Sequence, residues 1–235
     1  MKNSIALFLM LVVMCLTLHA QKGLEQVGVH FSISNFKNTE PIYPASLSGD
    51  GIVQVSPGVD YQHFFKDRLA VFTALGFAIF TERSENNDLR WPSEHDGMGG
   101  WTPNPSLPHQ SETKTSYFFL DWQLGLKYIA IQRKLSVFIM PYFESNFLVD
   151  HQSRQKLTYD DGHTESIPTS DFDRYDGLRK TNFSVGFGVG VQYPIAPRLC
   201  FYLMPQVEYM LRSATIDGYG KFVNYGGRVG LWYEF

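Results

Sequence analysis

Residues 182–193 read NFSVGFGVGVQY, and this stretch changes character at every step. Large apolar residues occupy the odd positions from Phe183 to Tyr193, whereas small or polar residues occupy the even positions from Asn182 to Gln192. Successive side chains of a β-strand point to opposite faces of the sheet. The stretch therefore predicts a strand with one apolar face and one polar, glycine-rich face.

Seven further segments repeat this two-residue period, and no segment of the sequence sustains a helical period. On the second face of residues 69–79, small residues replace most of the polar ones. Pro57, Pro141 and Pro205 lie on apolar faces within segments, and they predict local bulges because proline cannot donate a ladder hydrogen bond. The seven segments are residues 27–33, 53–62, 69–79, 117–128, 135–146, 199–212 and 224–235.

The links between segments form a second pattern, in which short and long links alternate strictly. The short links are residues 65–68, 130–134 and 194–198, and the longest ones are residues 82–112 and 150–178. Transmembrane barrels combine tight turns at one rim with long loops at the other. The two patterns together predict an all-β fold, an eight-stranded antiparallel up-and-down transmembrane β-barrel.

The first twenty residues have the order of a secretory signal: Lys2, an apolar run over residues 5–18, and Ala20. This run is shorter than the roughly 18 to 20 residues that a membrane-spanning helix needs. We expect a signal peptide at residues 1–20 and a barrel domain at residues 21–235. Met14 argues against lipidation of Cys15, so Cys200 would be the single cysteine of the exported chain and no internal disulfide could form.

Composition excludes one class of partner and supports the segregation of side chains. The chain has 20 basic and 23 acidic residues, for a net charge of −3, and its basic residues gather into no stripe. Nucleic acid is therefore a poor candidate partner. Aromatic residues make up 15% of the chain, yet the mean hydropathy is only −0.17. Apolar and polar residues must therefore occupy different faces.

Two arrangements fit the alternation: apolar faces toward lipid, or apolar faces inside a soluble lipocalin-like barrel. Charged residues at matching places on the polar faces favour the first, because in a narrow barrel they would form a buried, mutually paired network in the lumen. Tyr and Trp near the ends of the apolar faces also suit a lipid–water interface. The aromatics are Tyr61, Trp122, Tyr128, Tyr193, Tyr209, Tyr225 and Tyr233. The predicted lumen network is Asp60, Asp121, Lys127, Glu144, Glu208, Arg212 and Arg228.

The chain ends in Phe235, preceded at two-residue intervals by Tyr233, Leu231 and Val229. This ending resembles the sorting signal of outer-membrane β-barrel proteins. With the strand number and the asymmetry of the loops, the whole mature chain is similar to the small OmpA-like and porin-like barrels of Gram-negative bacteria. The resemblance implies an integral outer-membrane location, recognition by the barrel-assembly machinery, and contact with outer-membrane lipid and lipopolysaccharide.

Eight strands enclose a lumen just wide enough for side chains, so we expect no open pore. Long loops on a rigid scaffold often carry recognition, which favours a structural role, or a binding or adhesion role through external loops. The stretch 91–108, which includes Trp101, could contact a partner protein, a glycan or lipopolysaccharide.

A lipid-modifying enzyme, such as a lipid A or phospholipid acyl hydrolase, is the alternative function. Its candidate residues would be His30 with Ser32 and Ser34, or His63. Alternating polar residues are expected on any lumen face, and the sequence has no nucleophile elbow. We therefore expect no enzymatic activity.

Two groups of loop residues could hold a metal ion. Oxygen ligands at near-alternate spacing suit Ca²⁺, but a solvated acidic loop is the simpler interpretation of the first group, and unrelated surface histidines explain the second. We expect neither a metal nor a cofactor. The groups are Asp171, Asp173, Asp176 and Gly177, and His95, His109, His151 and His163.

Overall fold

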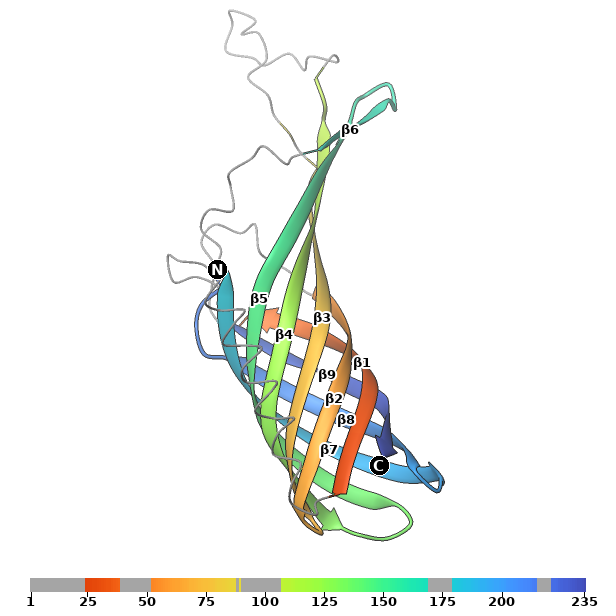
Figure 1. Ribbon diagram of the computed structural model, residues 1–235. Helices are drawn as coiled ribbons and strands as arrows, with labels where there is room; N and C mark the ends of the chain where they lie inside the picture. Colours follow the sequence, from red (N-terminus) through yellow and green to blue (C-terminus); the bar gives the residue numbers. More distant parts are fainter. Residues whose placement is uncertain (1–23, 39–51, 88, 90–106, 169–178, 215–220) are drawn as a thin grey trace, which may run out of the picture.

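The computed structural model describes residues 24–38, 52–87, 89, 107–168, 179–214 and 221–235. Within these residues the chain forms nine β-strands (Figure 1). The expected signal peptide lies outside the described residues. The strands are β1 (Leu24–Asn38), β2 (Ile52–Lys66), β3 (Leu69–Asn86), β4 (Gln110–Ile131), β5 (Ser136–Thr158), β6 (Thr164–Pro168), β7 (Thr181–Ala196), β8 (Leu199–Met210) and β9 (Phe222–Glu234).

Eight of these strands close into a ring in which every neighbour is antiparallel. The order is β1-β2-β3-β4-β5-β7-β8-β9, and β9 pairs back onto β1. Where the ring closes, Phe31 lies opposite Val229, and the backbone N–H of Phe235 donates to the carbonyl of Glu25 at 3.1 Å. The predicted eight-stranded up-and-down barrel is confirmed.

The ninth strand is a short addition outside the ring. β6 pairs only with the far end of β5 among the described residues, and all five of its residues are exposed. The sequence predicts a long loop here, because five residues with polar neighbours carry little alternation. In Figure 1, β6 and the ends of β3, β4 and β5 rise well beyond the rest of the ring.

The expected bulges at the prolines are wrong. Pairing between β2 and β3 pauses at Pro57 and resumes at Gly58 in the register set by Val55. Pro141 and Pro205 interrupt the ladders with β4 and β7 in the same way. A missing N–H therefore removes local hydrogen bonds here without adding a residue to the strand.

A register shift does occur on β5, where Leu148 pairs with Phe119 and Asp150 pairs with Phe118. Val149 is the extra residue of this bulge, and it is 62% exposed. Before the bulge, the outward residues of β5 have odd numbers, whereas after it they have even numbers. The bulge lies where β5 leaves the body of the barrel for the projecting part.

The two faces of the wall differ sharply in polarity. Apolar side chains such as Val29, Leu124, Val189 and Leu203 are 43–56% exposed on the outside. Buried polar side chains fill the inside. A lipocalin-like soluble barrel would need the opposite arrangement, so the structure excludes that alternative. In the described part of the chain, no helix is long and apolar enough to cross a membrane.

Candidate functional site

Glycines make room for the large side chains of the lumen. Phe138 lies directly across from Gly190, Tyr202 across from Gly230, and Trp232 across from Gly28. A Cβ atom at any of these glycines would collide with the facing ring. These glycines of β1, β7 and β9 therefore let aromatic rings lie against the inner wall.

An aromatic cluster closes the lumen near the rim that carries the short turns. Tyr202 and Trp232 stack with ring centroids 3.8 Å apart, and Phe138 packs 5.6 Å from Trp232. Phe72, Met140 and the other buried apolar residues complete the cluster.

Lys127 is fully buried within this cluster. Its Nζ atom donates to Oε1 of Gln62 at 3.0 Å and to Oε1 of Gln192 at 2.7 Å. The same nitrogen lies 3.4 Å from the centroid of the Trp232 ring and 4.6 Å from that of Phe138. Amide oxygens and ring faces thus surround the ammonium group, a favourable environment for a cation out of water.

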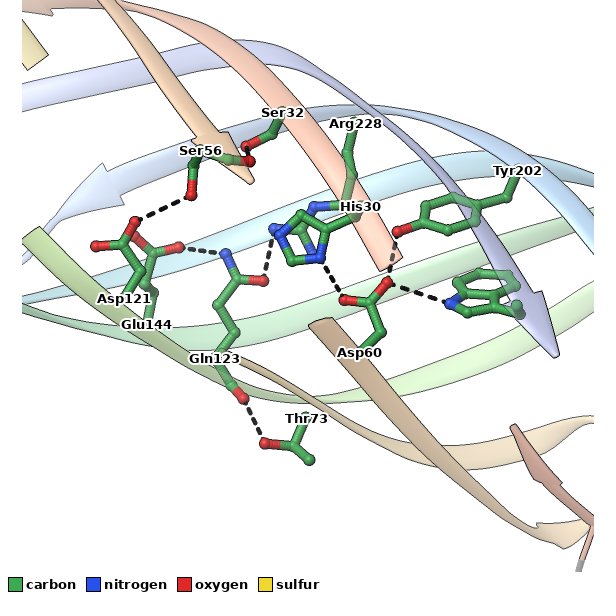
Figure 2. Close-up of polar contacts among 11 residues, drawn as sticks. His30, Ser32, Ser56, Asp60, Thr73, Asp121, Gln123, Glu144, Tyr202 and Arg228 are labelled. Carbon is green, nitrogen blue, oxygen red and sulfur yellow. Dashed lines mark hydrogen bonds and ion pairs between the residues drawn. The ribbon is translucent and has the colours of Figure 1, made fainter. Parts of the chain in front are cut away.

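Asp60 lies just beyond the aromatic cluster and accepts hydrogen bonds from three strands (Figure 2). Nδ1 of His30 lies 2.6 Å from Oδ1 of Asp60. The hydroxyl of Tyr202 and the indole N–H of Trp232 donate to Oδ2 at 2.7 Å and 3.2 Å. Both carboxylate oxygens are therefore satisfied, although only 2% of the residue is exposed.

Asp121 and Glu144 form an acidic pair that shares one amide group. Nδ2 of Asn146 donates to Oδ1 of Asp121 at 2.9 Å and also to Glu144. Gln54 and Ser56 donate to the other oxygen of Asp121, each at 3.4 Å.

Within the described part of the chain, Glu208 accepts hydrogen bonds from three neutral donors. The hydroxyl of Tyr142 donates at 2.6 Å, the amide of Asn224 at 3.0 Å and that of Gln206 at 3.2 Å. The lumen thus holds its carboxylates chiefly through amides and hydroxyls.

Arg228 reaches into the lumen from β9 and connects to the acidic pair through one glutamine. Its Nη2 atom donates to Oε1 of Gln123 at 2.6 Å, and Nε2 of Gln123 in turn donates to Glu144 (Figure 2). The other two guanidinium nitrogens are buried and have no hydrogen-bond partner among the described residues. Buried polar groups of this kind are ordinarily completed by internal water.

Six of the seven residues predicted for the lumen network therefore lie inside the barrel, all buried. Arg212 does not. β8 ends at Met210, and the exposed Arg212 beyond it places its guanidinium 5.6 Å from the centroid of the Phe183 ring. Alternation alone had assigned it to the interior, but alternation carries no information past the end of a strand.

The residues that hold this network together were not all found from the sequence. The sequence predicts His30 only as a catalytic candidate, and it predicts no role in the network for Gln123, Tyr142, Tyr202 and Trp232. Each shares the inward parity of its strand, so the faces could have been inferred. The cross-strand partners could not, because they depend on the register of the ring.

Of the hydrolase candidates, His30, Ser32 and Ser34 lie inside the wall, whereas His63 has the outward parity of β2. His30 and Ser32 are 7% and 6% exposed, and the Ser32 hydroxyl donates to the Ser56 carbonyl at 3.3 Å. Ser34 is also buried. Among the described residues, no serine hydroxyl forms a hydrogen bond with the ring of His30. His63 pairs with Glu25 near the short-turn rim, at 3.6 Å.

The metal candidates do not gather in the described residues. His109 pairs with Asp160 at 3.1 Å, and the His163 ring lies 5.7 Å from that of Tyr159. No group of three His, Cys, Asp or Glu residues within the described ranges could hold a metal ion. His95, the predicted acidic loop 171–177, and all but residues 107 and 108 of the 91–108 stretch lie outside the described residues.

A second candidate site is the part of the barrel that extends beyond the apolar wall. We call it the projection: residues 81–86 of β3, 110–116 of β4, 150–158 of β5, and β6. Its strands pair continuously, with Thr115 opposite Ser153 and Thr113 opposite Gln155. Ion pairs join Arg83 to Glu112 at 2.8 Å and to Glu85 at 2.9 Å. A continuous polar sheet therefore stands on the rim that carries the long loops.

A closed ring, an apolar outer surface and a polar lumen together define a small transmembrane β-barrel of the outer membrane. The ring leaves no open edge to lipid, and the outward side chains match a hydrocarbon environment. The residues of the C-terminal pattern lie on this outward face: Val229, Leu231, Tyr233 and Phe235.

Solved structures of the same general architecture are similar to the chain, at low sequence identity. Neisserial surface protein A is 11% identical, with a TM-score of 0.48, and the match covers 90% of this chain and 97% of that chain. A major outer membrane protein from Thermus thermophilus is 13% identical, with a TM-score of 0.43 and coverages of 90% and 99%. OprG from Pseudomonas aeruginosa is 11% identical, with a TM-score of 0.42 and coverages of 91% and 95%. No protein-family model matches the sequence, and no curated protein matches it.

Proposed function

We propose that the barrel is a non-conducting membrane anchor that presents the projection as a binding surface outside the cell. The observation that carries this proposal is the length of β4 and β5, at 22 and 23 residues. A strand needs only about 9–11 residues to cross a bilayer. Roughly half of each strand is thus available for a role beyond crossing the membrane.

The composition of the projection supports recognition rather than further contact with lipid. On β4, residues 110–116 read QSETKTS, and on β5, residues 150–156 read DHQSRQK. None of these residues is apolar. Because the segments belong to a continuous sheet, they hold polar side chains in fixed positions, which lowers the entropy lost when a partner binds.

The filling of the lumen supports the absence of an open pore. The aromatic cluster around Lys127 crosses the lumen near one rim, and the acidic network occupies its middle. Trp232, Tyr202 and Phe138 are each at most 1% exposed. A solute would have to displace several packed rings, so we expect no stable conductance.

Enzymatic hydrolysis of lipid has less support than binding. The Asp60–His30 pair has the geometry that orients a catalytic base, but it faces the packed lumen. Acyl chains lie outside the barrel. A lipid substrate would therefore have to cross the wall to reach this pair.

The test removes the projection and leaves the barrel. Residues 82–115 and 152–179 are each replaced by an Asn-Gly turn, which suits a tight hairpin. Cells that display the full or the shortened protein are compared for binding to arrays of glycans and matrix proteins. We expect both forms to show the heat-dependent gel shift of a closed barrel and only the full form to bind.

Planar-bilayer recordings provide a second readout. Equal array binding by the two forms, or none above that of cells lacking the protein, would exclude the projection as the binding surface. Stable conductance steps from the full protein would instead favour a channel.

A further inference from the structure

The outward face of the projection carries a row of three basic residues on three adjacent strands. Arg83 of β3 lies directly opposite Lys114 of β4, and Lys114 lies directly opposite Arg154 of β5. All three are exposed. The row exists only because the Val149 bulge moves the even-numbered residues of β5 to the outer face.

Acidic side chains of the protein pair with the positive charge at only one end of this row. Arg83 is bound by Glu85 and Glu112. Within the described residues, neither Lys114 nor Arg154 forms an ion pair. Like charges directly opposite one another destabilise a sheet. A site that keeps two such cations together, with no acid between them, is suited to an anion supplied from outside.

The charges in the neighbouring rows show from which side an anion could approach the site. Farther from the membrane, Glu85, Glu112 and Lys156 face outward in one row. Toward the membrane, the next row is the uncharged set Thr81, Ser116 and Gln152. An anion that approaches Lys114 and Arg154 from the membrane side therefore meets less repulsion from acidic residues than one that approaches from the far side.

The apolar wall begins one row below that uncharged set, with Ile79 opposite Phe118. Asp150, at the same level on β5, is the one acid at that boundary in the described rows. Two rows along a strand span about 13 Å, or about 10 Å of height at the usual barrel tilt. The headgroup layer extends roughly 5–8 Å beyond the hydrocarbon, and long Lys and Arg side chains can bend back toward it.

We propose that Lys114 and Arg154, flanked by Arg83, bind a phosphate group of the phosphorylated glycolipid in the outer leaflet. This inference depends on the outward orientation of the projection that underlies the proposed function. It does not depend on what the projection binds. The barrel would hold lipid headgroups against one side of its projection and so keep the sheet upright on the membrane.

The experiment uses the full-length mature barrel in a neutral detergent and lipopolysaccharide immobilised on a sensor surface. Lys114→Gln with Arg154→Gln is expected to weaken binding about 30-fold, since each basic residue near an anionic membrane surface contributes about a factor of five to six. Exchange of the two residues, Lys114→Arg with Arg154→Lys, keeps both charges and should retain binding.

The matched control is Arg133→Gln with Lys134→Gln. It removes the same two charges from the β4–β5 turn at the opposite rim, and it should leave affinity unchanged. All variants are first checked for the heat-dependent gel shift. Chemical removal of phosphate from the lipopolysaccharide should lower wild-type affinity to that of the Gln variant.

Three outcomes would overturn the proposal. These are unchanged affinity in the Lys114→Gln, Arg154→Gln variant, equal binding to dephosphorylated lipid, and an equal loss in the Arg133, Lys134 control. Tighter binding of a soluble sulfated glycan to the same residues would assign the row to a different partner. The array experiment on the shortened barrel remains a separate test of the proposed function.

Discussion

Asp60 joins four strands through one carboxylate. It lies on β2 and accepts hydrogen bonds from His30 on β1, Tyr202 on β8 and Trp232 on β9. Buried hydrogen bonds to a charged group contribute more than neutral ones, and removing the charge leaves its donors poorly matched. The carboxylate therefore stabilises the closure of the ring from within.

Asp60→Asn should lower the free energy of unfolding by about 3 kcal/mol. The amide keeps one accepting oxygen but presents an N–H₂ group to donors that need an acceptor. Urea titration in lipid vesicles, followed by tryptophan fluorescence, measures this change. Asp67→Asn, an exposed position in the β2–β3 turn, is the control, and equal effects at the two positions would contradict a special role for Asp60.

Gly190 and Gly227 offer a second comparison between single residues. A Cβ at Gly190 would enter the space of the Phe138 ring, whereas a Cβ at Gly227 meets nothing within 4 Å. Overpacking a filled interior costs about 1–3 kcal/mol. Gly190→Ala should therefore destabilise the barrel by this amount in the same urea titration, and Gly227→Ala should not. A similar loss at both glycines would mean that backbone effects, not ring packing, dominate.

At the scale of the element, each wall strand has a lipid-facing segment, and three of them, β3, β4 and β5, continue into water. Leu124 lies on the outward face of β4 within the apolar wall, and Gln152 lies outward on β5 above it. Leu124→Lys should cost about 2–4 kcal/mol, because a cation near the bilayer midplane is poorly solvated. Gln152→Lys should cost almost nothing. The free energy of unfolding of each variant is measured in vesicles and in detergent. An equal loss for Leu124→Lys and Gln152→Lys would contradict the position of the wall.

The elements also show how far the sequence can be interpreted. Two-residue alternation identified all eight wall strands and the lumen positions of Asp60, Lys127 and Arg228, because one face of each strand contacts an apolar medium. The same alternation fails beyond Val149, where a bulge exchanges the faces, and at Arg212, where the strand has ended. The projection was not predicted because polar residues occupy both of its faces, so its residues follow no apolar period.

The partners within the lumen could not be predicted for a different reason. Lys127 on β4 contacts Gln62 on β2 and Gln192 on β7, and these contacts exist only after the ring has closed. A single sequence gives the face of a residue but not the register of distant strands. The aromatic rings over glycines have the same origin.

At the scale of the whole molecule, assembly and stability can be separated at the C-terminus. Phe235 is 69% exposed, and its backbone N–H binds Glu25 while its ring packs on Tyr233. We predict that Phe235→Ala will reduce the amount of barrel in the outer membrane several-fold with little change in its unfolding free energy. The exposed ring stabilises little, but it completes the pattern proposed for recognition by the assembly machinery.

Quantitative immunoblots of outer-membrane fractions measure the amount of assembled barrel. Urea titration of protein refolded in vitro measures its free energy of unfolding. Phe201→Ala, another outward phenylalanine at 40% exposure, is the control for loss of a lipid-facing ring. Equal yields for Phe235→Ala and the wild type would argue against a sorting role for the terminal residue.

The hydrogen bond between Glu25 and Phe235 makes the two ends of the barrel chain neighbours. The strands of the closed ring form a cycle, so which strand comes first depends only on the order of the polypeptide. A circular permutant that joins these ends and opens the turn between Asp67 and Arg68 would keep every wall pairing. Its final strand would then be β2, which lacks the terminal aromatic pattern. Such a chain would retain every contact needed to fold into the same barrel, but it would lack the C-terminal pattern proposed to direct it to the outer membrane.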